Sequence, residues 1–339
     1  MARKACRKFT RAATACLLVL WGTTGCNVDV GPLHDAFIGK DRNPPIVLSV
    51  ESISSQCVVC TFDEPVRQDG SFRWLADGES PEAIAEDGAT IRISTKRFLP
   101  KGARFVVEGR VRDDAGNSTW FSVPCWGCNE TLAGLKINEF TTKGTDANPD
   151  RTELLVTDDG DIAGATLSNG PLDTWDTRII LPSQAVCAGD YIVVWWKGHP
   201  KIQSECNEDG THTYSFAVDG SPGLSANNGA LVLTENPAAQ AAIVDAVVYT
   251  NRETTTYDGF GSKPLQEMVR HLVASGYWKC ADTAAPDASC GIDSTHTSAT
   301  RSMARVPGLP DTDCASDWFV TETRGATFGE ANTDRRYER

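Results

Sequence analysis

The chain has 339 residues, with 32 basic and 45 acidic side chains and a formal net charge of −13. This length is enough for about two domains, and the negative charge argues against direct binding to nucleic acid or to anionic lipid surfaces. Short β-branched runs recur between turns rich in Gly and Pro, whereas amphipathic helical stretches are almost absent, so the sequence predicts an all-β protein.

The first 25 residues have the order of a secretory signal. They contain five basic and no acidic residues, then an apolar run at 16–21 that is shorter than the roughly 20 residues of a membrane span. The following Thr24-Gly25-Cys26 resembles the end of a bacterial lipobox. This resemblance implies lipid attachment at Cys26, membrane anchoring, and a cell-envelope location on the periplasmic or surface face. The alternative is an ordinary signal that is cleaved nearby, with Cys26 an unmodified cysteine.

Cleavage before Cys26 would leave a mature chain with a charge of −18, because five basic residues are lost. Residues 26–45 are polar and contain Pro, and we expect them to be a tether.

Residues 46–128 are expected to form the first domain. Alternating or β-branched runs at 46–50, 57–62, 72–75, 90–94 and 104–111 predict short strands. The segments Thr61-Phe-Asp-Glu-Pro-Val66 and Val111-Arg-Asp-Asp-Ala-Gly-Asn-Ser118 resemble bacterial Ig-like domains of surface proteins. The resemblance implies a β-sandwich that serves as a spacer or presentation module, without chemistry of its own.

Two CxxC pairs, Cys57–Cys60 and Cys125–Cys128, lie in this domain. A thioredoxin-like pair needs a helix after its first cysteine, and the β-branched sequence around Cys57 offers none. Two interpretations remain: disulfides that connect the strand to the domain exit, or a zinc site of four thiolates. Disulfides are favoured, because a strand turns Cys57 and Cys60 to opposite faces.

Residues 129–334 are expected to form a second, larger domain, followed by a tail at 335–339. Strands are predicted at 135–140, 151–156, 161–167, 177–182, 188–194, 228–233 and 243–249. The chain then ends with Arg301-Ser-Met-Ala-Arg305, Asp311-Thr-Asp313, Asp317-Trp318 and Thr327-Phe-Gly-Glu-Ala-Asn332. This order resembles bacterial lamin-tail domains, which implies a second Ig-like sandwich in tandem with the first. In that family, Asn138 and Glu139 would have a structural hydrogen-bonding role.

Two insertions enlarge the second domain. Residues 197–227 read as a loop with one short strand at 213–218, and residues 250–299 contain an amphipathic helix at 263–274, with Ser262 as its cap and Gly276 at its end. The remaining cysteines of an exported chain, Cys187, Cys206, Cys280, Cys290 and Cys314, are candidates for disulfides.

The sequence shows no catalytic motif. The five histidines are scattered, and the acidic runs 158–161 and 311–313 lack the full spacing of a calcium loop. We therefore predict a non-catalytic, cofactor-free envelope scaffold whose second domain contacts an unidentified protein or glycan. The alternatives are a zinc-binding module that uses the two CxxC pairs and, less favoured, a nucleic-acid tether.

Overall fold

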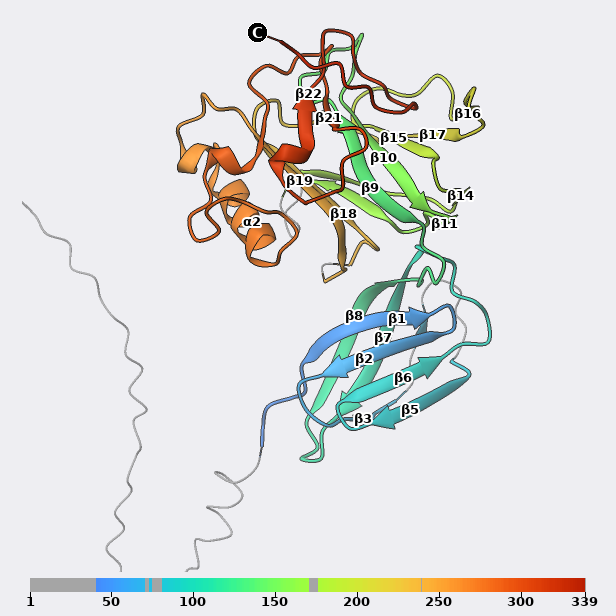
Figure 1. The fold of residues 1–339 in the computed structure, drawn as a ribbon. Helices are drawn as coiled ribbons and strands as arrows, with labels where there is room; N and C mark the ends of the chain where they lie inside the picture. The colour runs from blue at the N-terminus through green and yellow to red at the C-terminus, as the bar shows by residue number, and fades with distance from the viewer. Residues whose placement is uncertain (1–40, 71–72, 75–80, 171–175, 239, 339) are drawn as a thin grey trace, which may run out of the picture. The chain divides into compact units, whose positions relative to one another are not determined.

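The computed structural model describes residues 41–70, 73–74, 81–170, 176–238 and 240–338. The signal sequence, Cys26 and most of the expected tether therefore lie outside the described residues. Residues 43–339 form one unit that contains two separate hydrophobic cores. The regular secondary structure of the described residues consists mainly of strands, as predicted (Figure 1).

The first core lies between two small sheets. One sheet has the order β1-β2-β6-β5; in the other, β7 pairs with β8 along one edge and with β3 and β4 along the other. The strands are β1 Val47–Ser54, β2 Cys57–Phe62, β3 Arg67–Gln68, β4 Arg73–Trp74, β5 Ala83–Asp87, β6 Thr90–Ser94, β7 Arg104–Arg112 and β8 Ser118–Trp126. Alternation decides which side chains enter the core: Ile91 and Ile93 of β6 are buried, while Arg92 between them is exposed.

The second core lies between a seven-stranded sheet, order β16-β17-β15-β10-β9-β21-β22, and a five-stranded sheet, order β13-β12-β18-β19-β20. The strands of the larger sheet are β9 Gly134–Phe140, β10 Arg151–Asp158, β15 Tyr191–Trp195, β16 Ser204–Cys206, β17 His212–Ala217, β21 Met303–Arg305 and β22 Trp318–Val320. Those of the smaller sheet are β12 Thr166–Asn169, β13 Thr177–Ile180, β18 Gly229–Thr234, β19 Ile243–Thr250 and β20 Ile292–Asp293. A short pair, β11 Gly160–Asp161 and β14 Ala185–Val186, completes the β-structure.

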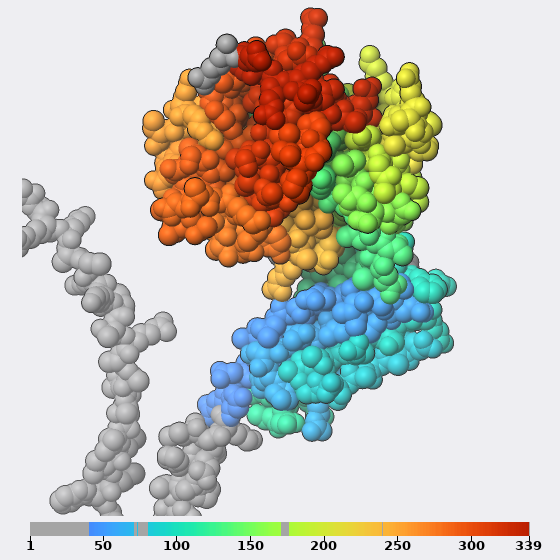
Figure 2. All heavy atoms as spheres, in the orientation of Figure 1, coloured from blue at the N-terminus to red at the C-terminus, as the bar shows by residue number. Residues whose placement is uncertain are grey.

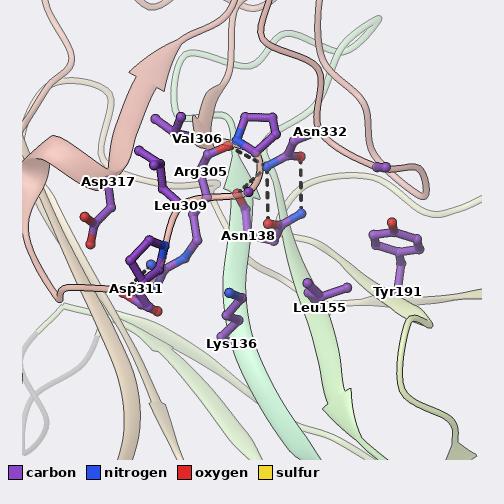
Figure 3. Close-up of a pocket in the computed structure, with 14 residues that line it drawn as sticks. Lys136, Asn138, Leu155, Tyr191, Arg305, Val306, Leu309, Asp311, Asp317 and Asn332 are labelled. Carbon is purple, nitrogen blue, oxygen red and sulfur yellow. Dashed lines mark hydrogen bonds and ion pairs between the residues drawn. The ribbon is translucent and has the colours of Figure 1, made fainter.

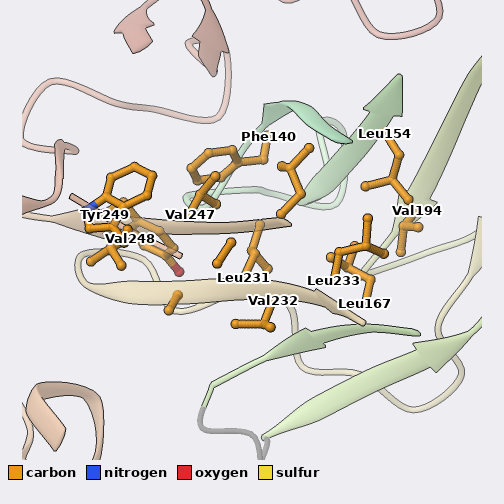
Figure 4. Packing of buried hydrophobic residues seen from close by; sticks show 14 of the residues in the cluster. Phe140, Leu154, Leu167, Val194, Leu231, Val232, Leu233, Val247, Val248 and Tyr249 are labelled. Atoms are coloured by element: carbon orange, nitrogen blue, oxygen red, sulfur yellow. The ribbon is translucent and has the colours of Figure 1, made fainter. Parts of the chain in front are cut away.

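Large apolar side chains from both sheets interlock in this second core (Figure 4). Leu154 and Val194 project from the larger sheet toward Leu231 and Leu233 of the smaller one, and all four are fully buried. Close packing of this kind supplies most of the stabilisation of a sandwich, because each buried aliphatic side chain contributes roughly 1.5–3 kcal/mol.

The predicted helix is α2, Lys263–Ala274, and its bounds match the prediction. The Ser262 hydroxyl accepts a hydrogen bond from the backbone N–H of Leu265, and Gly276 adopts a φ of +80° just beyond the end. The buried face of α2 packs against the second core beside β18 (Figure 1). Three short 3₁₀ turns accompany it: η1 Tyr257–Gly259, η2 Ala288–Cys290 and η3 Ala315–Asp317.

The insertion at 197–227 does more than form a loop. Its predicted strand is β17, which pairs in parallel with β15 and, with β16, extends the larger sheet. Residues 335–337, predicted to be a tail, also join the fold: Tyr337 N–H donates to the Val320 carbonyl at 2.8 Å and Glu322 N–H to the Arg335 carbonyl at 3.0 Å. The edge of β22 had unpaired backbone groups, and the end of the chain satisfies them. In the described part of the chain, no helix is both long and apolar enough to cross a membrane.

Candidate functional site

The two CxxC pairs do not form a single site. Cys60 is fully buried in the first core together with Cys125, whereas Cys57 lies on the other face of β2, with its sulfur 3.7 Å from the Arg92 guanidinium. No three of the four thiols lie within 4.8 Å of one another, although all four are among the described residues. The structure therefore does not assemble the four-thiolate zinc site. It does not contain the favoured disulfides either, because all four thiols are free in this structure. Burial raises the pKa of Cys60 to about 12, with a further contribution from nearby Cys125.

Among the remaining cysteines, the structure contains one disulfide, between Cys280 and Cys290. Cys187, Cys206 and Cys314 are free thiols in this structure. The prediction of disulfides thus holds for one pair of this group. That disulfide ties the segment after α2 to η2, where the Trp278 indole also donates to the Cys290 carbonyl at 2.9 Å.

A pair of buried glutamates occupies the outer side of the larger sheet. Glu139 of β9 and Glu153 of β10 are direct partners in the antiparallel register, and neither has any exposed surface. Such a pair is costly unless hydrogen bonds satisfy the carboxyl oxygens. Asn138 supplies one of them, since its side-chain amide donates to Glu153 at 2.7 Å. The structural role predicted for Asn138 and Glu139 agrees with these contacts.

Most of the remaining hydrogen bonds come from residues 327–332, which we call the closing segment, and the buried Ser302 hydroxyl also donates to Glu139. The backbone N–H and the hydroxyl of Thr327 each donate to Glu139 at 2.9 Å, and the Gly329 N–H donates to Glu153 at 2.5 Å. The Arg151 guanidinium carbon lies 4.1 Å from the centre of the Phe328 ring, a cation–π contact that holds the same segment. The space-filling view shows the C-terminal residues, coloured red, at the surface of this part of the molecule (Figure 2).

Burial has a strong effect on the acidity of this pair. Desolvation, followed by repulsion from Glu139, raises the pKa of Glu153 to about 8, and desolvation also raises the pKa of Glu139. Two adjacent carboxylates cannot both ionise easily without water, so at neutral pH the pair retains a proton. The closing segment shields both carboxyl groups from solvent, so that their hydrogen bonds stabilise the fold.

Beside the glutamate pair lies an open pocket of about 230 Å³ (Figure 3). Its floor includes Lys136, Leu155 and Tyr191, which are cross-strand partners in β9, β10 and β15. Residues 306–310 form one wall, and Asn332 of the closing segment forms part of another. The pairing register of the three strands creates this floor, because it places one outward-facing residue of each strand side by side across the sheet.

Buried Arg305 anchors the wall of this pocket. Its guanidinium pairs with Asp245 at 3.0 Å and with Asp311 at 2.5 Å, and it donates to the Ile137 carbonyl. Desolvation raises the pKa of Asp245 to about 6 even though Arg305 opposes this effect. The ionic groups at the rear of the pocket are therefore already paired.

The acidic run 311–313, considered at the sequence level as a calcium loop, lies at this point. Carboxylate oxygens of Asp245, Asp311 and Asp313 lie within 4.8 Å of one another. Arg305 pairs with two of these carboxylates, and the Lys279 ammonium lies 3.3 Å from the third. Since each of the three carboxylates has an ion pair with Arg305 or Lys279, the arrangement is that of an ion-pair network.

Sequence reasoning located Asn138 and Glu139 but missed Glu153, Arg305 and Lys136. The available signals were weak: Glu153 stands in an otherwise apolar strand, where an acid should not be buried alone, and Arg305 ends the Arg301-Ser-Met-Ala-Arg305 motif. The sequence gives no sign that Lys136 faces Leu155, because cross-strand partners are far apart along the chain.

One protein-family model matches the second half of the chain. Residues 133–320 match the family model described as "TP_1001_2nd: protein second domain". A protein of Treponema pallidum (strain Nichols), named "Uncharacterized protein", is 28% identical over 191 residues, which cover 50% of this chain and 47% of that protein. The chain thus spans about half the length of the curated relative that it matches.

Three solved structures give weak similarities. The N-terminal part of the bacterial S-layer protein SbsC is 16% identical, with a TM-score of 0.24, and the alignment covers 57% of this chain and 40% of the chain in that structure. Domains 1–6 of SbsC are 12% identical, with a TM-score of 0.25 and coverage of 66% and 42%. An L,D-transpeptidase from Mycobacterium smegmatis is 12% identical, with a TM-score of 0.20 and coverage of 51% and 90%. At these TM-scores, the similarities support no inference about function.

Proposed function

The chain belongs to the TP_1001_2nd family of protein second domains through residues 133–320, and we propose that it is a lipid-anchored scaffold protein of the cell envelope. In this proposal, Cys26 carries the lipid, residues 26–45 are the tether, and the Ig-like sandwich at 46–128 is a spacer. The sandwich at 129–334, a lamin-tail-like domain, makes the contact with a protein or glycan.

One observation carries the non-catalytic part of the proposal. Paired carboxyl groups are the side chains of this fold best suited to acid–base chemistry, yet Glu139 and Glu153 have no exposed surface. Their oxygens accept hydrogen bonds from Asn138, Thr327 and Gly329, so they hold the closing segment in place. A buried, fully hydrogen-bonded pair of this kind supports a structural role.

The open surface of the same sheet supports a binding role. The pocket over Lys136, Leu155 and Tyr191 stands next to the sealed pair, on strands that the closing segment fixes. A rigid sheet presents such a surface with little ordering cost, which is what a contact domain requires.

Lipid anchoring can be tested by labelling the full chain with a radioactive fatty acid during expression in a bacterial host. We expect the label and membrane fractionation to be lost in Cys26→Ser and retained in Cys16→Ser, a matched change inside the expected signal. A mature wild-type protein that is unlabelled and leaves the membrane fraction would contradict the anchor. A hydrolytic activity of the pure protein that a single substitution abolishes would contradict the non-catalytic role.

A further inference from the structure

The pocket of about 230 Å³ contains an unpaired cation. Lys136 is half-buried at the floor, and its ammonium has no hydrogen bond or ion pair within the described chain. Its cross-strand partner is the aliphatic side chain of Leu155. A lysine that is partly withdrawn from water beside an apolar neighbour favours an anionic partner.

The acids around the pocket are not free to serve as that partner. Asp311 is paired with Arg305 at 2.5 Å. Asp317 accepts hydrogen bonds from the Thr312 N–H at 2.8 Å and the Thr312 hydroxyl at 2.6 Å. The only cation of the pocket that lacks a protein partner in the described residues is therefore Lys136.

The other walls are mostly apolar and rigid. Residues 306–310, Val-Pro-Gly-Leu-Pro, contain two prolines, which have fixed φ angles and no N–H to donate. Leu309 on this wall is 56% exposed, an unusual position for a large aliphatic side chain at the rim of a pocket. Below it, Leu155 and the almost fully buried ring of Tyr191 complete an apolar surface.

We propose that this pocket binds the free carboxyl terminus of a partner protein whose last residue is aliphatic, with Lys136 pairing with the terminal carboxylate. The apolar side chain of that residue packs against Leu155 and Leu309. The inference rests on the proposed function, since it states what the second domain of the scaffold contacts.

The size of the pocket favours a chain end. Its volume is below the roughly 300–1,000 Å³ of sites that enclose a complete small molecule, so it suits one terminal residue. A free terminus adds a carboxylate to that residue, which a residue in mid-chain lacks. Capture of a C-terminal carboxylate is a recurring mode of peptide recognition, in which backbone N–H groups usually supply the donors. Here the Lys136 ammonium would supply the positive charge.

The polar groups that a glycan would need are already used. The side-chain amides of Asn138 and Asn332 donate to each other's oxygens, both at 3.2 Å (Figure 3). Among the side chains of the described residues that line the pocket, the donors without a partner are the Lys136 ammonium and the Tyr191 hydroxyl. A sugar ring presents several hydroxyls and would leave most of them unpaired here.

The test uses fluorescence polarisation of two fluorescein-labelled hexapeptides that end in Ala-Leu, one with a free carboxylate and one amidated, added to the full chain. We expect the free acid to bind at least about tenfold more tightly than the amide, because a charge-assisted pair is lost in the amide. Lys136→Gln should reduce affinity for the free acid by a similar factor. Lys201→Gln, which changes an exposed lysine elsewhere, should leave it unchanged.

Three results would overturn the proposal: no binding of the free acid at 1 mM peptide, equal binding of acid and amide, or full affinity in a Lys136→Gln variant. Displacement of the peptide by glucuronate at equal concentration would instead indicate an acidic glycan as the ligand, and would also refute it. A Leu309→Ala variant, on the exposed rim where folding is not at risk, should weaken binding of the free acid and not affect thermal stability.

The two proposals can fail separately. Loss of peptide binding with fatty-acid labelling intact would refute the carboxylate site and leave the anchored scaffold standing. Binding of the free acid by a chain that carries no lipid would refute the anchor and leave the pocket standing.

Discussion

Stability of the second domain should fall as the pH rises above neutrality, because of Glu153. Its pKa is raised from 4.5 to about 8 in the folded chain, by desolvation first and by Glu139 second. The folded state therefore binds a proton that the unfolded state has already lost, and the stabilisation is complete below pH 4.5 and lost as the pH rises through about 8. At about 1.4 kcal/mol per pKa unit, the whole effect is on the order of 5 kcal/mol.

The pH range of the measurement must be chosen so that the contribution of Glu153 to stability is distinguished from that of other buried acids. Asp245, whose pKa is raised to about 6, acts in the same direction, but its contribution has ended by about pH 7. Above about pH 8, the buried thiols Cys60 and Cys125 of the first core, whose pKa values are raised to about 12 and about 11, lower stability in the same direction. The glutamate pair is therefore followed by the difference in stability between wild type and Glu153→Gln, measured by chemical denaturation at intervals between pH 7 and pH 9. We expect wild type to lose free energy of unfolding relative to the variant across this range, by no more than about 1.4 kcal/mol per pH unit for one proton.

Glu153→Gln provides the decisive comparison. The amide has nearly the same shape and cannot ionise, so the variant should lose the part of the pH dependence between 7 and 9 that comes from Glu153. Glu205→Gln, a matched change at an exposed strand position, should keep the wild-type slope. A wild-type stability that is constant or increases with pH, or a full slope in Glu153→Gln, would refute this reasoning.

Three further predictions concern the packing and crosslinks of the same domain. Thr327→Val removes a hydroxyl that donates to a buried carboxyl oxygen of Glu139 at 2.9 Å, and should lower the free energy of unfolding by about 1–3 kcal/mol. It should also make the C-terminal residues accessible to limited proteolysis. Unchanged protection from the protease would contradict the role of the closing segment. Cys280→Ser removes the disulfide to Cys290, which closes a short loop, and should lower the free energy of unfolding by roughly 2–3 kcal/mol. In thermal melts, a reducing agent should cause the same loss in wild type. The control Cys314→Ser, which changes a free thiol, should not show this loss. Leu231→Ala opens a cavity in the second core and should cost about 2–5 kcal/mol in denaturant titrations; a cost below 1 kcal/mol would mean that the core repacks around the site.

The sequence by itself determined those features that depend on neighbours along the chain. Alternation of apolar and polar residues predicted the strand at 90–94, because successive side chains of a strand point to opposite faces. The helix at 263–274 was predicted with its bounds, since the spacing of its apolar residues, the Ser262 cap and Gly276 are all local signals. The opposite orientation of Cys57 and Cys60 also follows from strand geometry alone.

Only the tertiary structure decided what depends on register between distant strands. Glu139 and Glu153 are 14 positions apart, and Thr327 and Gly329 come from the far end of the chain, yet their hydrogen bonds converge at one buried place. The alignment of Lys136 with its neighbours in β10 and β15 has the same origin. A shift of one residue in pairing would turn each side chain to the other face, and no local pattern encodes which pairing is adopted, because it is the packing of the whole core that selects it.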